Sequence, residues 1–345
     1  MANMLLKAVI FALLGLSGLN SALAQDFPTR PLTMVIPFSA GGPTDVLGRV
    51  VAARMSEVLG QQVVVENVGG AGGMNGSYRI SNAAPDGYQF VLGTVGTHAQ
   101  GQTLYKKPLY NSLTDFTPVA LLAEVPILLI VRKDLPPKNF KEFVAYAKAN
   151  QAKMQFGSAG AGSATHLGCV LLNHVLGIDV THVPYRGTGP AMQDLQGGRI
   201  DYLCEIITTA KPQVDGGTVR ALAIFDTKRS PALPEVPTAL EQGTPDLIAY
   251  TWNALFLPKN APEAIVNKLN AAARETMKSQ VVRERLEALG AQVSVRGPHV
   301  ARAFAHVCGK RDRQMGGADQ GERSDDRVAH FPAKWEPVRC RKCGH

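Results

Sequence analysis

The stretch PFSAGGPTDVLGR (residues 37–49) lies between a short apolar run and a helical pattern, and it contains two adjacent glycines. Glycines let a backbone approach a ligand closely, and Pro43 suits the first position of a helix. The first N–H groups of a helix have no partner inside it and lie at the positive end of its dipole. Such a turn can hold a phosphate or a carboxylate without a lysine, and a simple helix cap is the third interpretation.

The stretch GSAGAGSATH (residues 157–166) repeats this arrangement later in the chain. It begins in the predicted strand 153–158, and a predicted helix runs from it to about residue 176. Ligands of open α/β sheets bind at the carboxyl ends of strands, which is where both turns lie. Two matched turns therefore predict one anion site with a turn on each side.

Predicted strands and helices alternate along the chain. Short apolar runs predict strands at 32–37, 61–67 and 219–225, and helical patterns occupy 43–60 and 139–149. This alternation predicts an α/β fold whose parallel sheets are covered by helices on both faces.

Two crossover segments divide the predicted fold. The run FTPVALLAEVPILLIVRKD (116–134) predicts two successive strands broken at Pro126, and a strand near 248 returns after a proline-rich linker. We therefore expect two α/β domains with a ligand cleft between them. Domain 1 would comprise 25–124 and 248–307, and domain 2 would comprise 125–247.

The N-terminus has the three parts of a secretory signal peptide. Lys7 precedes a 12-residue apolar segment (AVIFALLGLSGL), and Ala22-Leu23-Ala24 forms a cleavage site. The apolar segment is shorter than a membrane-spanning helix requires. We expect residues 1–24 to be removed and the mature chain to be periplasmic, an uncleaved anchor being the alternative.

Composition narrows the function classes. The 345 residues are 45% hydrophobic and 19% charged with a formal net charge of +8, which is typical of a soluble globular protein. The basic residues form no run of five and few aromatic residues accompany them, so nucleic-acid binding is not expected. The glycine-rich VGGAGGMNG (68–76) fits a dinucleotide fingerprint only loosely and lacks the acid that would complete it.

Catalytic signatures are missing as well. The serines of the two turns lack a G-x-S-x-G elbow, and the sequence has no H-E-x-x-H motif, P-loop or clustered pair of acids. Cys169 and Cys204, each among apolar residues, are predicted to be small buried hydrophobic side chains. The chain is therefore predicted to hold an anion without transforming it, with no cofactor and no metal.

Eight stretches of the sequence, in this order, resemble one family. They are VIPFSAGGPTDVLGR, ENVGGAGGMNG, AAPDGYQFVLGT, GSAGAGSATHLG, THVPYRGTGPAMQDLQGGRIDY, RALAIF, RSPALPEVPT and NALFLPKNAPEAIVNKLN. From about residue 26 to 296 the chain resembles the Bug (TctC) family of periplasmic solute-binding proteins of tripartite tricarboxylate transporters. The resemblance implies the type II periplasmic binding protein fold, whose two domains close on a small carboxylate with one loop from each.

The resemblance also implies a set of ligand-binding residues. Domain 1 would contribute the first turn and the end of a neighbouring strand, namely Phe38, Ser39, Ala40, Gly41, Gly42, Asp45, Thr94, Thr97 and His98. Domain 2 would contribute the second turn, the PYRGTGPA loop and the strand DYLCE, namely Ser158, Ala159, Gly160, Gly162, Ser163, Thr165, His166, Tyr185, Arg186, Gly187, Thr188, Asp201 and Glu205.

Three of these residues have alternative interpretations. Asp45 is equally suited to bracing the start of its own helix, and Arg186 to being a solvated loop cation. Glu205 in a ligand site would suit a ligand with an amine or a protonated group.

The C-terminal segment departs from the family pattern. The composition changes abruptly after about residue 307, where family members carry an amphipathic helix, so we hypothesise a frameshifted or degenerate C-terminus at 308–345. The alternative is a metal knuckle formed by Cys340, Cys343 and His345 with Cys308 or His306, although two well-spaced ligand pairs are lacking.

The residues and the resemblance together predict a monomeric extracytoplasmic receptor for a small carboxylate. Its closed form would be recognised by membrane permease subunits or by a sensor kinase ectodomain. One alternative is a secreted hydrolase of small acids or esters that depends on Ser158. Another is a degenerate family member without function.

Overall fold

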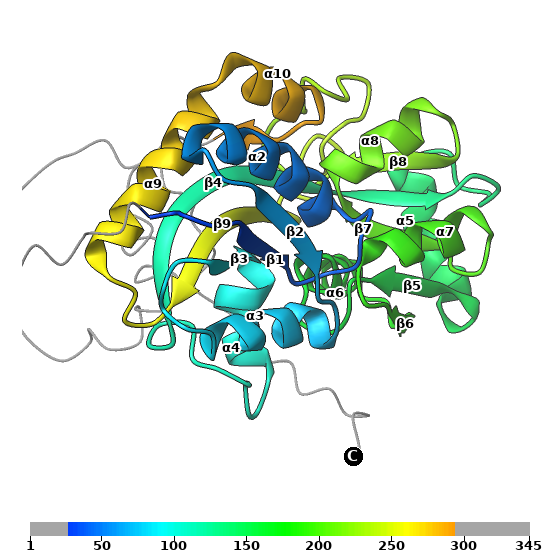
Figure 1. Ribbon diagram of the computed structural model, residues 1–345. Helices are drawn as coiled ribbons and strands as arrows, with labels where there is room; N and C mark the ends of the chain where they lie inside the picture. The colour runs from blue at the N-terminus through cyan, green and yellow to red at the C-terminus, as the bar shows by residue number, and fades with distance from the viewer. Residues whose placement is uncertain (1–26, 294–345) are drawn as a thin grey trace, which may run out of the picture. The chain divides into compact units, whose positions relative to one another are not determined.

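The computed structural model describes residues 27–293, in which helices pack on both faces of a ten-stranded mixed sheet (Figure 1). The strands are β1 (Leu32–Ile36), β2 (Val63–Asn67), β3 (Gln89–Thr94), β4 (Phe116–Arg132), β5 (Gln155–Ser158), β6 (Thr181–Pro184), β7 (Tyr202–Ile206), β8 (Val219–Ile224), β9 (Tyr250–Pro258) and β10 (Gln292–Val293). The predicted signal peptide (1–24) and the atypical tail (308–345) lie outside the described residues.

The helices include those that the hydrophobic periodicity predicts. They are α2 (Pro43–Leu59), α3 (Met74–Ser81), α4 (Gly101–Leu104), α5 (Phe140–Asn150), α6 (Ala164–Leu176), α7 (Thr188–Gln196), α8 (Ile207–Asp215), α9 (Glu263–Lys278) and α10 (Gln280–Ala288). A 3₁₀ turn η1 (Ala71–Gly73), a π-helical turn η2 (Gly96–Gln100) and the helices α4 and α10 were not predicted. None of the helices in the described part of the chain has the length and apolarity to cross a membrane.

Strand β4 joins the two halves of the sheet, whose order is β2-β1-β3-β9-β4-β7-β5-β6. Its residues 116–126 pair with β9, and its residues 127–132 pair with β7 and β8. The prediction of two strands broken at Pro126 was wrong, because β4 is continuous. Proline cannot donate a ladder hydrogen bond, and Pro126 lies where the partner strand changes.

The prediction of parallel sheets was right for only part of the structure. Strand β1 runs parallel to β2 and β3, and β5 runs parallel to β6 and β7. In contrast, β4 and β9 are antiparallel to their neighbours. These two strands carry the chain out of the first half of the sheet and back into it, so they do not belong to strand–helix–strand repeats.

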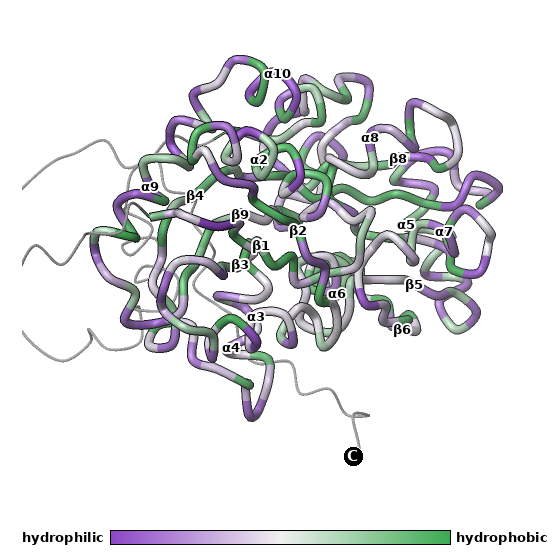
Figure 2. The backbone as a smooth tube through the Cα atoms, in the orientation of Figure 1, coloured by the Kyte–Doolittle hydropathy of each residue, from purple (hydrophilic) through white to green (hydrophobic). Residues whose placement is uncertain are grey.

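Strand β1 is buried on both faces, which fixes the turn that follows it. Leu32 and Met34 belong to a hydrophobic cluster that includes residues of α2 and α9, whereas Val35 belongs to a second cluster with Met74 and Ile80 of α3. In Figure 1, α2 and α3 lie on opposite sides of this strand. Figure 2 shows hydrophobic residues along the central strands and hydrophilic residues on the outer helices.

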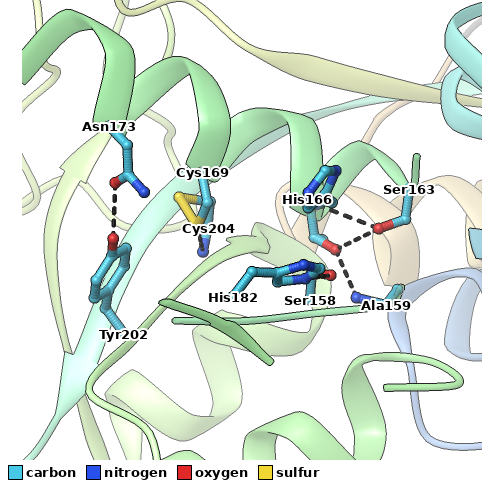
Figure 3. Close-up of a disulfide and its surroundings, with 10 residues drawn as sticks. Ser158, Ala159, Ser163, His166, Cys169, Asn173, His182, Tyr202 and Cys204 are labelled. Carbon is cyan, nitrogen blue, oxygen red and sulfur yellow. Dashed lines mark hydrogen bonds between the residues drawn. A yellow bond between two sulfur atoms is a disulfide. The ribbon is translucent and has the colours of Figure 1, made fainter. Parts of the chain in front are cut away.

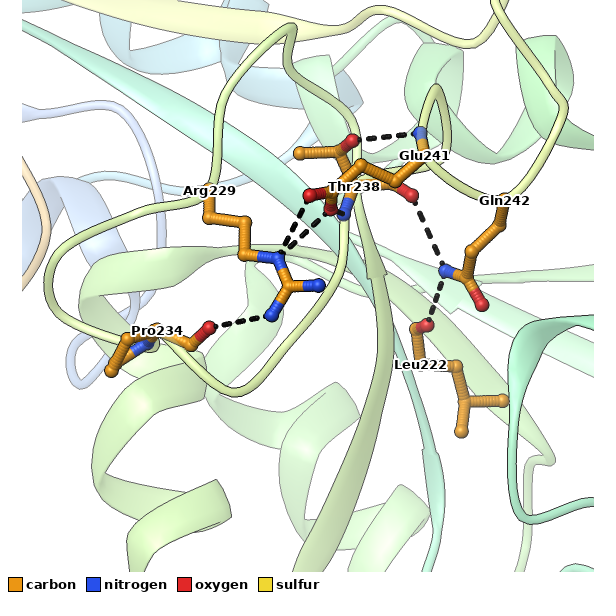
Figure 4. A network of polar contacts seen from close by, with 6 residues as sticks. All are labelled: Leu222, Arg229, Pro234, Thr238, Glu241 and Gln242. Carbon is orange, nitrogen blue, oxygen red and sulfur yellow. Dashed lines mark hydrogen bonds and ion pairs between the residues drawn. The ribbon is translucent and has the colours of Figure 1, made fainter.

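The proline-rich segment that returns to β9 is held in place by polar contacts (Figure 4). The Arg229 guanidinium contacts both carboxylate oxygens of Glu241 at 2.9 and 3.0 Å, and Glu241 accepts a hydrogen bond from the Thr238 backbone N–H at 2.7 Å. Gln242 Nε2 donates to the Leu222 carbonyl oxygen of β8 at 3.1 Å. The segment is therefore anchored to the sheet at β8.

Cys169 of α6 and Cys204 of β7 form a disulfide in the protein interior (Figure 3). The prediction that these cysteines are buried is confirmed, but the prediction that they are simple hydrophobic side chains was wrong. They lie 35 residues apart, and only the packing of α6 on β7 brings their Cα atoms to 5.2 Å. The disulfide connects two elements whose ends line the cavity described below.

Reduction of this disulfide should lower the stability of the protein. Closing a 35-residue separation stabilises the folded state by about 4 kcal/mol, mainly by restricting the unfolded chain. We expect a reductant to lower the thermal midpoint of the wild type and to leave the midpoint of the Cys169→Ala/Cys204→Ala double variant unchanged. Mass spectrometry of the unreduced protein should show one linked peptide pair containing Cys169 and Cys204. Two free thiols at these positions would contradict the structure.

Candidate functional site

A small cavity lies between the two halves of the sheet. Its lining combines hydroxyl-bearing and apolar side chains, namely Phe38, Pro43, Thr44, Thr94, Ala159, Ser163, Ala164, Thr165, Thr188, Ile206 and Thr251. The cavity volume is about 20 Å³, close to the space for one water molecule. This lining, all of it within residues 27–293, contains no charged side chain.

Four helices begin at this cavity. Pro43 and Thr44 are the first residues of α2, Ala164 and Thr165 are the first residues of α6, and Thr188 is the first residue of α7. Helix α8 starts directly after Ile206, which also lines the cavity. The first N–H groups of a helix lack intrahelical partners and carry partial positive charge. Their convergence makes the cavity suitable for an anion although it has no cationic side chain.

The β1–α2 loop (residues 37–42) owes its shape to Asp45. The buried Asp45 carboxylate accepts hydrogen bonds from Gly41 N at 3.0 Å, Arg49 Nε at 3.0 Å and Asn67 Nδ2 at 2.9 Å. Burial alone would raise the pKa of Asp45, but the hydrogen bonds from Arg49, Gly41 and Asn67 outweigh burial and lower it. Asp45 is therefore an ionised brace, and it is not among the residues that line the cavity.

The β5–α6 loop (residues 159–163) is held by its own hydroxyl groups (Figure 3). Ser163 caps α6 by accepting from His166 N at 3.2 Å, and it donates to the Gly160 carbonyl oxygen at 2.7 Å. Thr165 Oγ1 accepts from Ala159 N at 3.0 Å. Three residues of this network also line the cavity, so the network sets their positions.

Ser158 is hydrogen bonded to a histidine but does not line the small cavity. Its Oγ is 2.7 Å from His182 Nε2 and accepts from Gly160 N at 3.0 Å. Within the described residues, no carboxylate is hydrogen bonded to His182, so a third group of a catalytic triad is not in place. The rings of His166 and His182 are 4.4 Å apart, and burial lowers the pKa of each to about 4. His166 Nδ1 accepts from Gly162 N at 3.2 Å, so the pair supports the loop.

His98 lies in an aromatic cluster behind the cavity. Its ring stacks on Phe256 at 4.0 Å and meets the edge of Phe116 at 4.6 Å, and its Nδ1 is 2.8 Å from Thr97 Oγ1. Thr97 Oγ1 also accepts from Thr94 N at 2.9 Å. Complete burial lowers the pKa of His98 to about 3, so the ring is neutral. Thr94 lines the cavity, whereas Thr97 and His98 support it from behind.

The other predicted residues of the second half have contacts of their own. Tyr185 donates to Asp194 Oδ2 at 2.7 Å, and burial raises the pKa of Tyr185 well above its ordinary value. Arg186 has an exposed side chain and takes part through its carbonyl oxygen. Asp201 pairs with Arg132 at 3.0 Å, at the opposite end of β7 from the cavity. The contacts of Asp201 favour a structural role.

Glu205, by contrast, lies behind the cavity wall, in contact with Thr188 and Ile206, which line the small cavity. Its fully buried Oε1 accepts from Thr188 Oγ1 at 3.1 Å, Ile206 N at 2.9 Å and Thr209 Oγ1 at 2.9 Å. Its Oε2 has no hydrogen-bond partner among the described residues. Burial raises the pKa of Glu205 to about 7, against the lowering effect of its hydrogen bonds.

A second, wider cavity adjoins the other side of Thr188. Its volume is about 500 Å³, and it lies between the β1–α2 loop, α7 and α8. Ala40 and Gly41 line it, as does Thr208, whose buried Oγ1 has no partner within the described residues. Thr188 is shared by both cavities, so the two are neighbours.

Loops from the two halves contact each other next to residues that line the small cavity. Ser39 N donates to the Arg186 carbonyl oxygen at 3.1 Å. Gly187, the N-cap residue of α7, lies against Ser39, and Gly42 lies beside Thr188.

The glycine-rich β2–α3 connection makes a second such contact. A Cβ on Gly72 would overlap the Ala161 carbonyl oxygen, so only glycine permits this approach. Tyr105 Oη lies 3.0 Å from the Ala71 carbonyl oxygen and 2.7 Å from that of Ala161, and it shares its one hydrogen between them. The VGGAGGMNG stretch is thus a contact surface between the halves.

Some of the predicted site residues line the small cavity, and some residues that line it were not predicted. Phe38, Thr94, Ala159, Ser163, Thr165 and Thr188 were predicted site residues, and all line the cavity. Pro43, Thr44 and Ala164 were omitted although the predicted helix starts pointed to them. Ile206 and Thr251 carry no local signal, because their position depends on how β7 and β9 pair with β4.

Protonation of His98 should destabilise the protein in acid. Because its pKa is about 3 when folded and about 6.5 when unfolded, stability is complete above pH 6.5 and falls as pH decreases below it. His98→Phe keeps an aromatic ring on Phe256 and should remove about 2 kcal/mol of the loss between about pH 6.5 and 5, measured by urea unfolding. The exposed His174→Phe is the matched control. An unchanged acid dependence in His98→Phe would contradict this placement.

Comparisons with known proteins agree with the architecture. An Agrobacterium vitis protein described as "UPF0065 protein in the TAR-I ttuE-ttuC' intergenic region" is 44% identical over 270 residues, which are 78% of this chain and 78% of the relative. The periplasmic binding protein BugD has a TM-score of 0.80 at 38% identity, with 81% of this chain and 95% of BugD covered. MatC from Rhodopseudomonas palustris, solved with bound malate, has a TM-score of 0.78 at 42% identity, with 81% and 97% covered.

These neighbours confirm the expected fold class, a periplasmic binding protein with two α/β domains, while the predicted domain boundaries stay predictions. Residues 47–306 also match the family model described as "Tripartite tricarboxylate transporter family receptor". The chain therefore belongs to the TctC family, the receptors of tripartite tricarboxylate transporters.

Proposed function

We propose that this chain is a periplasmic receptor that binds a small carboxylate in the cavity between its two halves. The supporting observation is the start of α2, α6, α7 and α8 at one cavity whose lining has hydroxyl groups but no cation. Backbone N–H groups at helix starts bind carboxylates well, and a flanking hydroxyl adds direction to the contact. MatC, a relative of similar fold, was solved with malate, which makes malate a suitable first ligand to test.

Binding would require the two halves to separate and close again. The cavity of about 20 Å³ holds about one water molecule, whereas a dicarboxylate has many more atoms. In this proposal the described arrangement is close to the closed form, and β4 and β9 carry the hinge. Ligand binding shifts the equilibrium toward closure, and membrane permease subunits or a sensor kinase ectodomain bind the closed form.

The hydrolase alternative has less support. Ser158 is buried, does not line the small cavity, and its histidine partner has no acid hydrogen bonded to it in residues 27–293. A nucleophile must reach its substrate, and Ser158 is instead part of the packing beneath the β5–α6 loop. Recovery of unaltered carboxylate after incubation with the protein would support the receptor.

Thr44 provides the sharpest test of carboxylate binding in the cavity. Its side chain is buried at the second position of α2, and its hydroxyl has no hydrogen-bond partner among the described residues. Thr44→Val removes that hydroxyl with little change of shape. We expect malate affinity, measured by calorimetry, to fall roughly 10-fold or more, as a lost hydrogen bond to a charged group implies.

The matched control is Thr208→Val, since Thr208 is also buried and unpartnered within residues 27–293 but lines only the second cavity. This variant should bind malate like the wild type. Equal malate affinities for both variants would contradict the proposed site. A folded wild type that binds no carboxylate would contradict the proposed function.

Gly72 tests whether closure is needed for binding. In Gly72→Ala the new Cβ would meet the Ala161 carbonyl oxygen only while the two loops are in contact, so the closed form should become less stable. We expect malate affinity to fall roughly 10-fold or more, with faster dissociation by stopped-flow measurement. Gly60→Ala is the control: its φ of 67° matches the 62° of Gly72, and no atom lies within 4 Å of its Cβ. Both variants should lose about 1 kcal/mol of stability from backbone strain. Equally tight malate binding by both would contradict closure through this contact.

A further inference from the structure

The Glu205 carboxyl is a buried acid beside the proposed anion site, and its described contacts include no cation. Its Oε1 is hydrogen bonded to Thr188 and to the Ile206 N–H, and both of those residues line the small cavity. Its Oε2 is buried and has no partner among the described residues. A buried carboxylate normally has a cationic partner or gives up its charge by taking a proton.

We propose that Glu205 determines the charge of the ligand complex: the receptor captures a carboxylate only with Glu205 protonated, so that one proton enters with each anion. This inference rests on the proposed function. In the balanced step, one ligand anion, one ionised Glu205 and one proton combine. The product is the complex of the anion with neutral Glu205. The proton is expected on Oε2, because three donors already occupy Oε1.

Anion binding and protonation of Glu205 are expected to be coupled because Thr188 both lines the cavity and contacts the Glu205 carboxyl. Thr188 Oγ1 is 3.1 Å from Glu205 Oε1 and lines the cavity, so an anion in contact with Thr188 would lie about 5 Å from the carboxyl. Two like charges at about 5 Å in a dielectric of about 20 repel strongly enough to lower affinity roughly 100-fold. A neutral Glu205 removes this repulsion, and its pKa of about 7 makes protonation easy near neutral pH.

Other titratable groups around β7 do not offset the Glu205 charge. The pKa of Glu205 is governed by burial and by its hydrogen bonds with Ile206, Thr209 and Thr188, and no charged residue is among the causes. The titratable residues on the elements that pack against β7 and on the neighbouring α2 are Glu124, Arg132, His166, His174, Asp194, Lys211, Asp215, Asp45, Arg49, Arg54 and Glu57, the last two forming an ion pair with each other.

Most of these residues are engaged elsewhere. Arg132, Asp194, Lys211 and Arg49 each have an ion-pair partner of their own. Glu124 and His174 are exposed, and His166 is neutral because burial lowers its pKa to about 4. Glu205 is therefore the group beside the cavity that can change its charge when an anion binds.

Calorimetry of the full chain with malate between about pH 6.5 and 8.5, where malate is fully ionised, tests the inference. Wild-type affinity should fall as pH rises, approaching 10-fold per unit above the pKa of Glu205. At about pH 8.5, the binding heat should vary linearly with the ionisation enthalpy of the buffer. The slope of that line should correspond to about one proton taken up per malate bound. This second readout needs no variant, so it applies even where a substitution unfolds the chain.

Glu205→Gln should bind malate with an affinity that is independent of pH. Its binding heat should not depend on the ionisation enthalpy of the buffer, because no proton is taken up. Glu124→Gln, an exposed change on β4, should behave like the wild type. Malate binding by the wild type with neither pH dependence nor proton uptake would overturn the inference and leave the receptor function standing. A folded Glu205→Gln variant that fails to bind malate at every pH would also overturn the inference. A folded wild type that binds no carboxylate even at pH 6.5 would instead contradict the receptor function itself.

Discussion

The first N–H groups of α2, α6, α7 and α8, which have no partner within their own helix, are the constraint on which the rest of the site depends. Each helix start is buried beside the same small cavity, where water cannot fully solvate its partial positive charge. An anion at this point would contact several helix starts at once, so the proposed site needs no arginine or lysine. The loops before these helices are glycine-rich and hydroxyl-rich because they must approach closely and hydrogen bond locally.

The parts of the fold with strong local signals could be predicted from the sequence. The helix that begins at Pro43 and ends before Gly60 follows from its proline, its apolar periodicity and its terminal glycine. The β1–α2 and β5–α6 turns were identified because a strand, glycines, a hydroxyl and a helix occur in that order, and residues of both turns line the cavity. The alternative interpretation of Asp45, as a brace of its own helix, agrees with the three hydrogen bonds it accepts.

The features that depend on distant pairing could not be predicted in this way. Thr251 reaches the cavity only because β9 lies between β3 and β4, and Cys169 meets Cys204 only because α6 packs on β7. The contact of Gly72 with Ala161 joins loops about ninety residues apart, and no local pattern in VGGAGGMNG indicates it. His98 was expected beside the ligand but does not line the small cavity, because its ring turns toward Phe256, which its position after β3 does not show.

A crystal structure of the full chain grown with malate is the most direct test of the central claim. The account predicts a malate carboxylate between the starts of α2 and α6, within hydrogen-bond distance of backbone N–H groups at Thr44 or Thr165 and of the Thr44 hydroxyl, with no arginine or lysine in contact. Malate bound elsewhere, or held in this cleft by a cationic side chain, would contradict it.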